Sequence, residues 1–162
     1  MMSAHAMAHA TAWEALFRAQ VAVVRHLAAD DVWEELTMKE YDVLFTLSRG
    51  PADGLRLKEL NADVLLSQPS LSRLVDRLVA RGLVARRAVA DDLRGTRVVL
   101  TDAGRALQRR VGRRHVASID AALGGALSAD ELTTLTELTD RLRNHVASLP
   151  AVARTTSTKE PS

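Results

Sequence analysis

Arginines are concentrated in one stretch of this 162-residue chain. Residues 55–114 hold 14 Lys/Arg and 6 Asp/Glu, a net charge of +8, whereas the remainder of the chain carries −6. Lys58 is the single lysine among those fourteen cations. A guanidinium presents N–H donors in a planar fork that matches phosphate oxygens and the edge of guanine. The stretch could therefore bind nucleic acid, although a solvated basic surface has the same composition.

Enzyme chemistry has little support among the other reactive residues. His115 and Ser118 lie three residues apart, as a base and a nucleophile could, but the sequence offers no third group to orient them. His5 and His9 have helical spacing for a metal, without a third ligand in view. The chain has no cysteine, which excludes thiolate chemistry and disulfides. We expect no enzyme activity, no cofactor and no bound metal.

The composition is that of a globular protein with a helical core. Apolar residues make up 47%, charged residues 26% and aromatic residues 3% of the chain. Because Leu, Val and Ala supply most of the apolar bulk, the core is expected to consist of helix faces. No run approaches 18 apolar residues and the first residues lack a basic segment, so we expect a cytoplasmic protein without membrane association.

Cap signals predict where the long helices begin. Three capping boxes, each a Ser or Thr followed three residues later by Glu, predict helix starts at Thr11, Thr37 and Ser128. A further helix is expected from Thr101 to Leu123. Two shorter helices are expected across residues 57–64 and 69–81. Residues 1–10 and 151–162 are expected to be disordered.

Two β-prone runs follow the second short helix. Residues 83–89 and 96–100 are joined by a segment of turn composition, which predicts a hairpin with an arginine, Arg94, at its tip. Helix, turn, helix and a two-stranded ribbon together form the plan of a winged helix-turn-helix. The expected fold class is thus mainly α, with a β wing.

The second helix of such a pair enters the major groove of DNA. Its inward set is expected to be Leu71, Leu74, Val75 and Leu78, which turns Pro69, Ser72, Arg73 and Asp76 outward and leaves Ser70 and Arg77 at the flanks. An amphipathic surface helix whose arginines pair with Asp76 would give the same pattern. The ribbon favours DNA, because a guanidinium at a turn can enter a narrow minor groove.

One segment resembles a known family. Ser70-Leu71-Ser72-Arg73 followed by Leu78, Gly82-Leu83-Val84, Asp92, Arg94, Thr101 and Gly104, in that spacing, is similar to the signature of the MarR family of bacterial transcriptional regulators. The agreement covers about a dozen positions, and the order of helices agrees along nearly the whole chain. One departure is Leu93, which stands where the family commonly has a basic residue.

The resemblance implies a set of DNA contacts. The residues expected in or beside the major groove are Gln68, Pro69, Ser70, Ser72, Arg73 and Arg77. Arg94 is expected in the minor groove, oriented by Asp92 through a charge-assisted pair, with Arg97 on the same wing. Ser67, Arg86 and Arg87 are expected to contact phosphates, although Arg86 could equally line the base of the wing.

The resemblance also implies a homodimer. In the family, the first and last helices intertwine with those of a second subunit, and the long apolar stripe of the last helix fits that role. We therefore expect one domain over residues 11–150, with dimerisation helices at 11–36 and 101–150 and a winged lobe at 37–100. A monomer that folds both ends over its own core is the alternative.

Many members of the family release DNA when a small anionic aromatic compound binds between the dimerisation helices and the winged lobe. Trp13, Tyr41, Asp42 and His115 lie on the elements that would line such a pocket. The alternative is that these four side chains simply pack or are solvated.

The expected function is a ligand-responsive repressor that binds a pseudo-palindromic operator as a homodimer. A first rival is a ligand-binding or protein-interaction winged helix without sequence-specific DNA binding. The segregation of charge disfavours that rival. A second rival, a small hydrolase that uses His115 and Ser118, has the weakest support.

Overall fold

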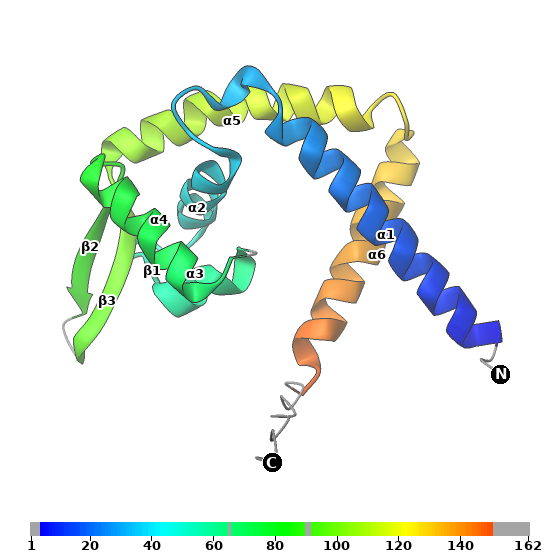
Figure 1. The fold of residues 1–162 in the computed structure, drawn as a ribbon, viewed down its shortest axis with the longest axis horizontal. Helices are drawn as coiled ribbons and strands as arrows, with labels where there is room; N and C mark the ends of the chain where they lie inside the picture. The colour runs from blue at the N-terminus through cyan, green and yellow to red at the C-terminus, as the bar shows by residue number, and fades with distance from the viewer. Residues whose placement is uncertain (1–3, 65, 90–91, 151–162) are drawn as a thin grey trace, which may run out of the picture. The chain divides into compact units, whose positions relative to one another are not determined.

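The structure, a computed structural model, describes residues 4–64, 66–89 and 92–150 (Figure 1). Contacts divide the chain into two compact units, Met1–Ala122 and Leu123–Ser162. The elements of the first unit are α1 (Ala4–Ala28), a short 3-10 helix η1 (Asp31–Trp33), α2 (Met38–Arg49), β1 (Leu55–Arg56), α3 (Leu57–Asp63), α4 (Gln68–Ala80), β2 (Val84–Val89), β3 (Asp92–Leu100) and α5 (Asp102–Leu123). The second unit contains α6 (Ala129–Ser148).

The first unit contains the predicted winged helix-turn-helix. Helices α3 and α4 form the helix pair, and β2 and β3 form an antiparallel ribbon that extends beside α4 (Figure 1). The sheet has three strands in the order β1-β3-β2, one more than the sequence predicts. The extra strand is only two residues long, Leu55 opposite Val98 and Arg56 opposite Arg97, and so short a pairing leaves no periodicity to detect.

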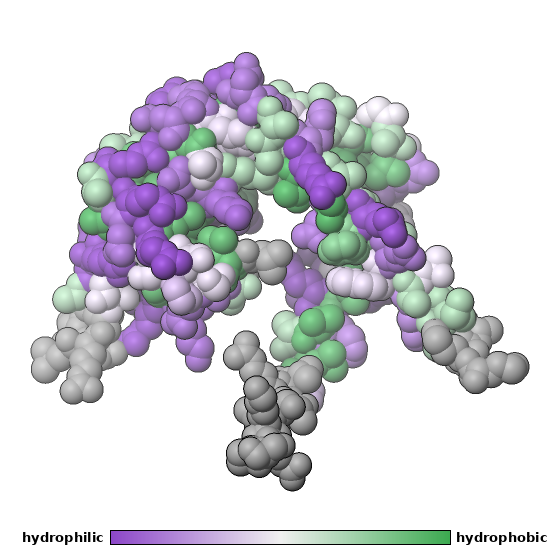
Figure 2. All heavy atoms as spheres, viewed as in Figure 1, coloured by the Kyte–Doolittle hydropathy of each residue, from purple (hydrophilic) through white to green (hydrophobic). Residues whose placement is uncertain are grey.

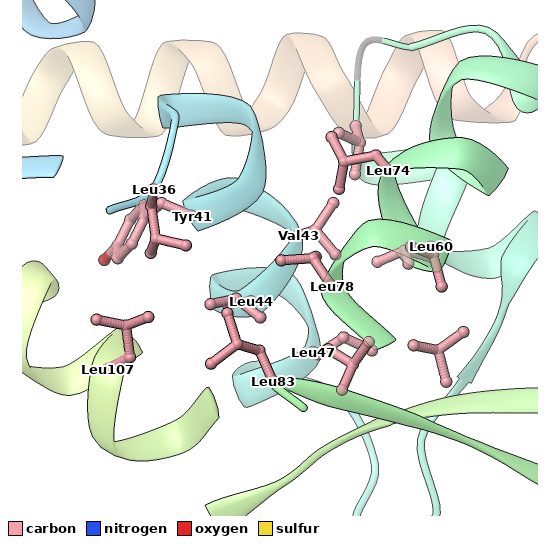
Figure 3. Packing of buried hydrophobic residues seen from close by; sticks show 14 of the residues in the cluster. Leu36, Tyr41, Val43, Leu44, Leu47, Leu60, Leu74, Leu78, Leu83 and Leu107 are labelled. Atoms are coloured by element: carbon pink, nitrogen blue, oxygen red, sulfur yellow. The ribbon is translucent and has the colours of Figure 1, made fainter. Parts of the chain in front are cut away.

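A single apolar cluster holds the winged lobe together. Side chains from α2, α3, α4, β2 and α5 converge in it (Figure 3). Leu44, Leu60, Leu71 and Leu78 are fully enclosed. The inward set predicted for α4 is confirmed, since Leu71, Leu74, Val75 and Leu78 are all buried. Burial of these side chains fixes which face of α4 remains in solvent.

Thr101 ties the end of the ribbon to the start of α5. Its hydroxyl donates to the carbonyl of Gly82 at 2.7 Å and accepts from the N–H of Gly104 at 3.0 Å. Gly104 approaches the ribbon so closely that a Cβ there would lie 1.9 Å from the carbonyl oxygen of Leu83. The predicted start of this helix at Thr101 and its end at Leu123 are confirmed.

Two of the three predicted capping boxes are present. Thr37 with Glu40 begins α2 and Ser128 with Glu131 begins α6. The prediction at Thr11 is wrong, because α1 already begins at Ala4 and the Thr11 hydroxyl donates to the carbonyl of Met7 inside that helix. The Ala- and Met-rich segment before Thr11 has high helix propensity, so the expected disorder of residues 4–10 is wrong as well. Residues 1–3 and 151–162, also expected to be disordered, lie outside the described residues.

The helix of the second unit has an exposed apolar stripe. None of the residues of α6 is buried. Leu135, Leu138, Leu142 and Val146 are between 42% and 56% exposed, and hydrophobic side chains reach the surface along this helix (Figure 2). Among the helices that the structure describes, none is long and apolar enough to cross a membrane.

Candidate nucleic-acid interface

The solvent face of α4 carries most of the residues predicted for the major groove. Ser67, Gln68, Pro69, Arg73 and Arg77 are exposed, and Ser70 and Ser72 are partly buried. Pro69 lies in the first turn, where its missing N–H leaves no hydrogen bond unmade. This face therefore presents hydroxyls, an amide and guanidinium groups together.

Arg73 and the serines at the start of α4 are held differently. Arg73 makes no ion pair or hydrogen bond with the residues that the structure describes, so the N–H groups of its guanidinium remain available to bind DNA. The Ser67 hydroxyl donates to the hydroxyl of Ser70 at 2.8 Å and does not cap the backbone of α4. The side chain of Ser67 thus leaves the backbone N–H groups of the first turn uncapped, and such groups at a helix start can bind a phosphate.

Arg86 belongs to the base of the wing. Its guanidinium forms an ion pair with Asp76 of α4 at 2.7 Å, so it joins the ribbon to the outward face of that helix. This is the alternative that the sequence left open for Arg86. Arg87, its neighbour, is exposed and forms no ion pair with the residues that the structure describes.

Arg97 has protein partners on three sides. Its guanidinium donates to the carbonyl of Gly54 at 2.7 Å and lies 3.5 Å from Asp53 and 3.6 Å from Glu59. These contacts fasten β3 to the loop before β1 and to α3. They favour a structural role for Arg97 over the wing contact with DNA that the sequence analysis predicted.

Strand β3 begins at Asp92 and not at residue 96 as predicted, so Asp92 and Arg94 lie on the strand and not in the turn, and Val89 is paired with Asp92 across the ribbon. The side chains of residues 92–95 and the whole of residues 90 and 91 lie outside what the structure describes. The expected pair between Asp92 and Arg94 is therefore still a prediction from the sequence.

The acidic segment around η1 pairs with arginines of α5. Arg110 contacts Glu34 at 3.0 Å, and this hydrogen bond holds the pKa of the Glu34 carboxyl below its usual value. Arg114 lies 3.5 Å from both Glu34 and Asp31. Two arginines counted as part of the basic stretch are thus neutralised by acidic residues from outside it.

Tyr41 and His115, two of the four residues predicted for an effector pocket, lie together. Their ring centroids are 5.4 Å apart, and both rings pack against Trp33, which is buried. Burial lowers the pKa of His115, against the opposing effect of the nearby Asp30 carboxylate. Burial raises the pKa of Tyr41, and the charge of Asp42 acts in the same direction.

Trp33 was not predicted to be part of this site. Its residue type alone indicates a core or interface anchor, which its burial confirms, but no spacing rule connects it to Tyr41 or His115. Its indole N–H donates to the carbonyl of Leu27 at 2.8 Å, which ties the end of α1 to the cluster. Trp13, by contrast, is 64% exposed on α1 and stacks on Phe17.

A pocket of about 480 Å³ opens beside this cluster. It is lined by residues of α2 and α5, namely Tyr41, Phe45, Gln108, Arg109, Gly112, Arg113 and Val116. The rings of Tyr41 and Phe45 are stacked with centroids 6.1 Å apart. Arg109 and Arg113 form no ion pair with any residue that the structure describes. The pocket therefore combines aromatic surface with free positive charge.

The residues of the hydrolase alternative do not form a catalytic pair. The Ser118 hydroxyl donates to the carbonyl of Arg114 at 3.3 Å. The His115 ring packs on Trp33 and Tyr41, and its Nδ1 is buried without a partner among the described residues.

Comparisons with known proteins agree with the winged lobe. A sequence model described as the MarR family matches residues 35–95. The HTH-type transcriptional regulator PecS of Dickeya dadantii is 28% identical over 130 residues, which cover 78% of each chain.

Solved structures extend the likeness to nearly the whole chain. Sco3205 of Streptomyces coelicolor, a MarR family transcriptional regulator crystallised in complex with DNA, gives a TM-score of 0.75 at 24% identity, over 95% of this chain and 94% of that one. The PcaV regulator of the same organism, solved with its natural ligand, gives a TM-score of 0.63 at 26% identity, over 90% of this chain and 99% of that one. The winged lobe of this chain therefore matches the MarR family model over residues 35–95, and the chain as a whole is similar to transcriptional regulators of that family.

Proposed function

We propose that this protein is a ligand-responsive repressor that binds a pseudo-palindromic DNA site as a homodimer. The observation that carries the proposal is the division of α4 into two faces. Its apolar face is wholly buried, and its outer face presents Arg73, which has no hydrogen-bond or ion-pair partner among the residues that the structure describes. A guanidinium free of ion pairs can form the paired hydrogen bonds with a guanine edge that discriminate between bases.

Binding-site selection with the purified protein tests DNA recognition. We expect a two-fold symmetric consensus, with half-sites about 10 base pairs apart, because two recognition helices of a dimer meet successive major grooves on one face of the duplex. Arg73→Ala should relax the consensus at one position of each half-site. Arg143→Ala, which removes the same charge from α6, should leave the consensus intact. Failure to select any consensus would favour the rival winged helix without sequence-specific binding.

The apolar stripe of α6 supports the homodimer. Its exposed leucines are too many for a helix that stays in water, and the first and last helices of a second copy would cover them. Leu138→Glu should convert the dimer to a monomer and abolish operator binding. Asn144→Glu, on the opposite face of α6, should leave the dimer intact. Sedimentation equilibrium measures both, and a wild-type monomer at micromolar concentration would contradict the proposal.

The pocket between α2 and α5 supports an anionic aromatic effector. Arg109 and Arg113 would pair with a carboxylate, and Tyr41 and Phe45 would contact the ring. The likeness to the PcaV regulator, which was solved in complex with its natural ligand, supports a ligand site in this protein. Aromatic carboxylates should quench the fluorescence of the buried Trp33 and release operator DNA. Arg113→Ala should weaken both effects, whereas neutral analogues of the same compounds should have neither.

Repression is tested at the promoter. We expect the wild-type protein to protect DNA upstream of its own gene in a footprint, over a site longer than about 15 base pairs, because two half-sites must be covered. Transcription from that promoter should fall when the protein is added. A rise in transcription would show that the regulator is an activator.

A further inference from the structure

Glu40 lies between the recognition helix and the start of α2. It is the one charged residue counted as buried among those the structure describes. Its Oε1 lies 3.9 Å from Nε of Arg77, and its Oε2 lies 3.5 Å from Nη1 of Arg81. One carboxylate therefore faces two guanidinium groups, from the last turn of α4 and from the residue that follows it.

The carboxylate of Glu40 is fixed independently of Arg77. Its Oε2 accepts hydrogen bonds from the backbone N–H of Thr37 at 2.8 Å and from the Thr37 hydroxyl at 3.2 Å, which close the capping box of α2. Arg81 is also held in place, because its Nη2 donates to the carbonyl of Glu35 at 3.0 Å. If Arg77 leaves, Glu40 keeps its hydrogen bonds and one positive partner.

Arg77 is held much more loosely. Its side chain is 60% exposed, against 31% for Arg81, and 3.9 Å is too long for a hydrogen bond to Glu40. Arg77 lies four residues after Arg73, so the two share one face of α4. A partly exposed ion pair is weak in water, and a phosphate can displace the carboxylate from it.

We propose that Glu40 is a positioning residue that competes with DNA phosphate for the guanidinium of Arg77. In the free protein Arg77 rests on Glu40, and on the duplex it exchanges the carboxylate for a phosphate while Arg81 stays in place. This inference rests on the proposed DNA binding. It assigns Arg77 to the DNA backbone, whereas the sequence analysis placed it with the residues of the major groove.

The exchange lowers affinity for random and specific DNA alike. Phosphate contacts are sequence-independent, so a carboxylate that opposes one of them weakens binding to every duplex. An operator that also offers base contacts starts from a higher affinity, so the same cost leaves it bound at protein concentrations at which a random duplex is released. Glu40 therefore lowers residual binding to random DNA without touching DNA, and it leaves the ratio of specific to random affinity unchanged.

Glu40→Gln is the variant that separates charge from fold. Gln at this position can still accept the Thr37 N–H, since capping boxes use Glu or Gln. Glu131→Gln is the matched control, because Glu131 closes the capping box of α6 and forms no ion pair with the residues that the structure describes. Both variants are checked by circular dichroism and thermal unfolding before binding is measured.

Affinity for a random duplex and for the selected operator is then measured over a range of salt concentrations. Glu40→Gln should bind the random duplex about two- to five-fold more tightly, the range that a partly exposed ion pair implies. Glu131→Gln should bind like wild type. In an Arg77→Ala background, Glu40→Gln should have no effect, and Arg77→Ala alone should lower the salt slope by about one. The proposal would be overturned if Glu40→Gln bound the random duplex no more tightly than wild type. It would also be overturned if the gain in affinity persisted in the Arg77→Ala background.

A second measurement needs no change at Glu40. The Nε–H resonances of the arginines are followed by NMR in the wild-type protein, with Arg77 assigned by Arg77→Lys. Random duplex should shift the resonance of Arg77 and leave that of Arg81 in place. The exchange would be contradicted if the resonances of both Arg77 and Arg81 shifted, or if neither did. If the wild-type protein binds no duplex at all, the proposed function fails together with this inference. If the wild-type protein binds DNA but Glu40→Gln does not change its affinity, only the inference is refuted.

Discussion

The hydroxyl of Tyr41 occupies the space that a side chain at position 112 would need. A Cβ on Gly112 would lie 2.9 Å from the Tyr41 hydroxyl oxygen and 3.4 Å from the amide nitrogen of Gln108. Helix α5 therefore accepts a glycine in its interior, although glycine weakens a helix. The gain is that the Tyr41 ring reaches α5 and forms one wall of the pocket with Arg109 and Arg113.

Gly112→Ala tests this relationship through two opposing terms. Alanine should stabilise α5 by about 0.5–1 kcal/mol, but the contact with the Tyr41 hydroxyl should cancel that gain. In a Tyr41→Phe background the contact is relieved, so the same substitution should raise the free energy of unfolding. Urea unfolding of the four proteins measures the coupling. Equal effects of Gly112→Ala in both backgrounds would show that the hydroxyl does not control this position.

Gly104 should tolerate no side chain. Its Cβ would lie 1.9 Å from the Leu83 carbonyl oxygen, and backbone cannot move aside as a flexible side chain can. We expect Gly104→Ala to cost about 1–3 kcal/mol or more of stability, the range for overpacking. Gly125→Ala is the matched control, since no atom of the described residues beyond its two chain neighbours lies within 4 Å of the position that a Cβ would take. Thermal unfolding should separate the two variants, and similar melting temperatures would contradict the close approach of α5 to the ribbon.

His115 should make stability depend on pH in a defined direction. Burial lowers its pKa in the folded protein below the usual 6.5, while the unfolded chain keeps the usual value. As pH falls below 6.5, the unfolded state binds a proton that the folded state resists, so the folded state loses stability. Above 6.5 the histidine is neutral in both states and contributes no pH dependence.

The measurement is the melting temperature of wild type and His115→Gln between pH 7.5 and 5.0. The wild type should lose more stability on acidification than the variant, because the variant lacks the titrating group. His9→Gln, which removes an exposed histidine of α1, should follow the wild-type curve. A His115→Gln curve parallel to wild type would show that protonation of His115 is not opposed by the fold.

The sequence sufficed to predict the winged lobe because the signals there are local. Capping boxes at Thr37 and Ser128, the apolar spacing of α4 and the glycine that follows it each act within a few residues. The same rule failed at Thr11, where the motif is present but the preceding residues are themselves strong helix formers.

Contacts between distant segments were not predictable from spacing. Trp33 meets Tyr41 and His115 only after η1, α2 and α5 have packed together. Glu40 was predicted as part of a capping box, and its second use by Arg77 and Arg81 depends on how α4 docks on α2. The partners of the arginines were equally unpredictable. Their number predicts a basic surface, whereas Arg86, Arg97 and Arg110 form ion pairs with acidic residues of the protein itself.

The last prediction concerns Arg73 and Arg94, which the sequence analysis assigns to different grooves. Arg73 lies on the exposed face of α4 and can read a guanine edge, so Arg73→Ala should lose about 1–3 kcal/mol and relax the preference at one position of each half-site. Its effect should be a loss of discrimination between operators.

Arg94 belongs to the wing, and the minor groove that a wing enters presents a degenerate code. Arg94→Ala should therefore weaken binding to all sites of similar groove width and reduce the preference for A·T-rich flanks, with the core consensus intact. Asp92→Ala should act in the same direction but more weakly, and the double variant should be less than additive if Asp92 orients Arg94. Binding-site selection at one fixed salt concentration compares the variants. If Arg94→Ala alters the core consensus while Arg73→Ala only lowers affinity uniformly, the two residues have been assigned to the wrong grooves.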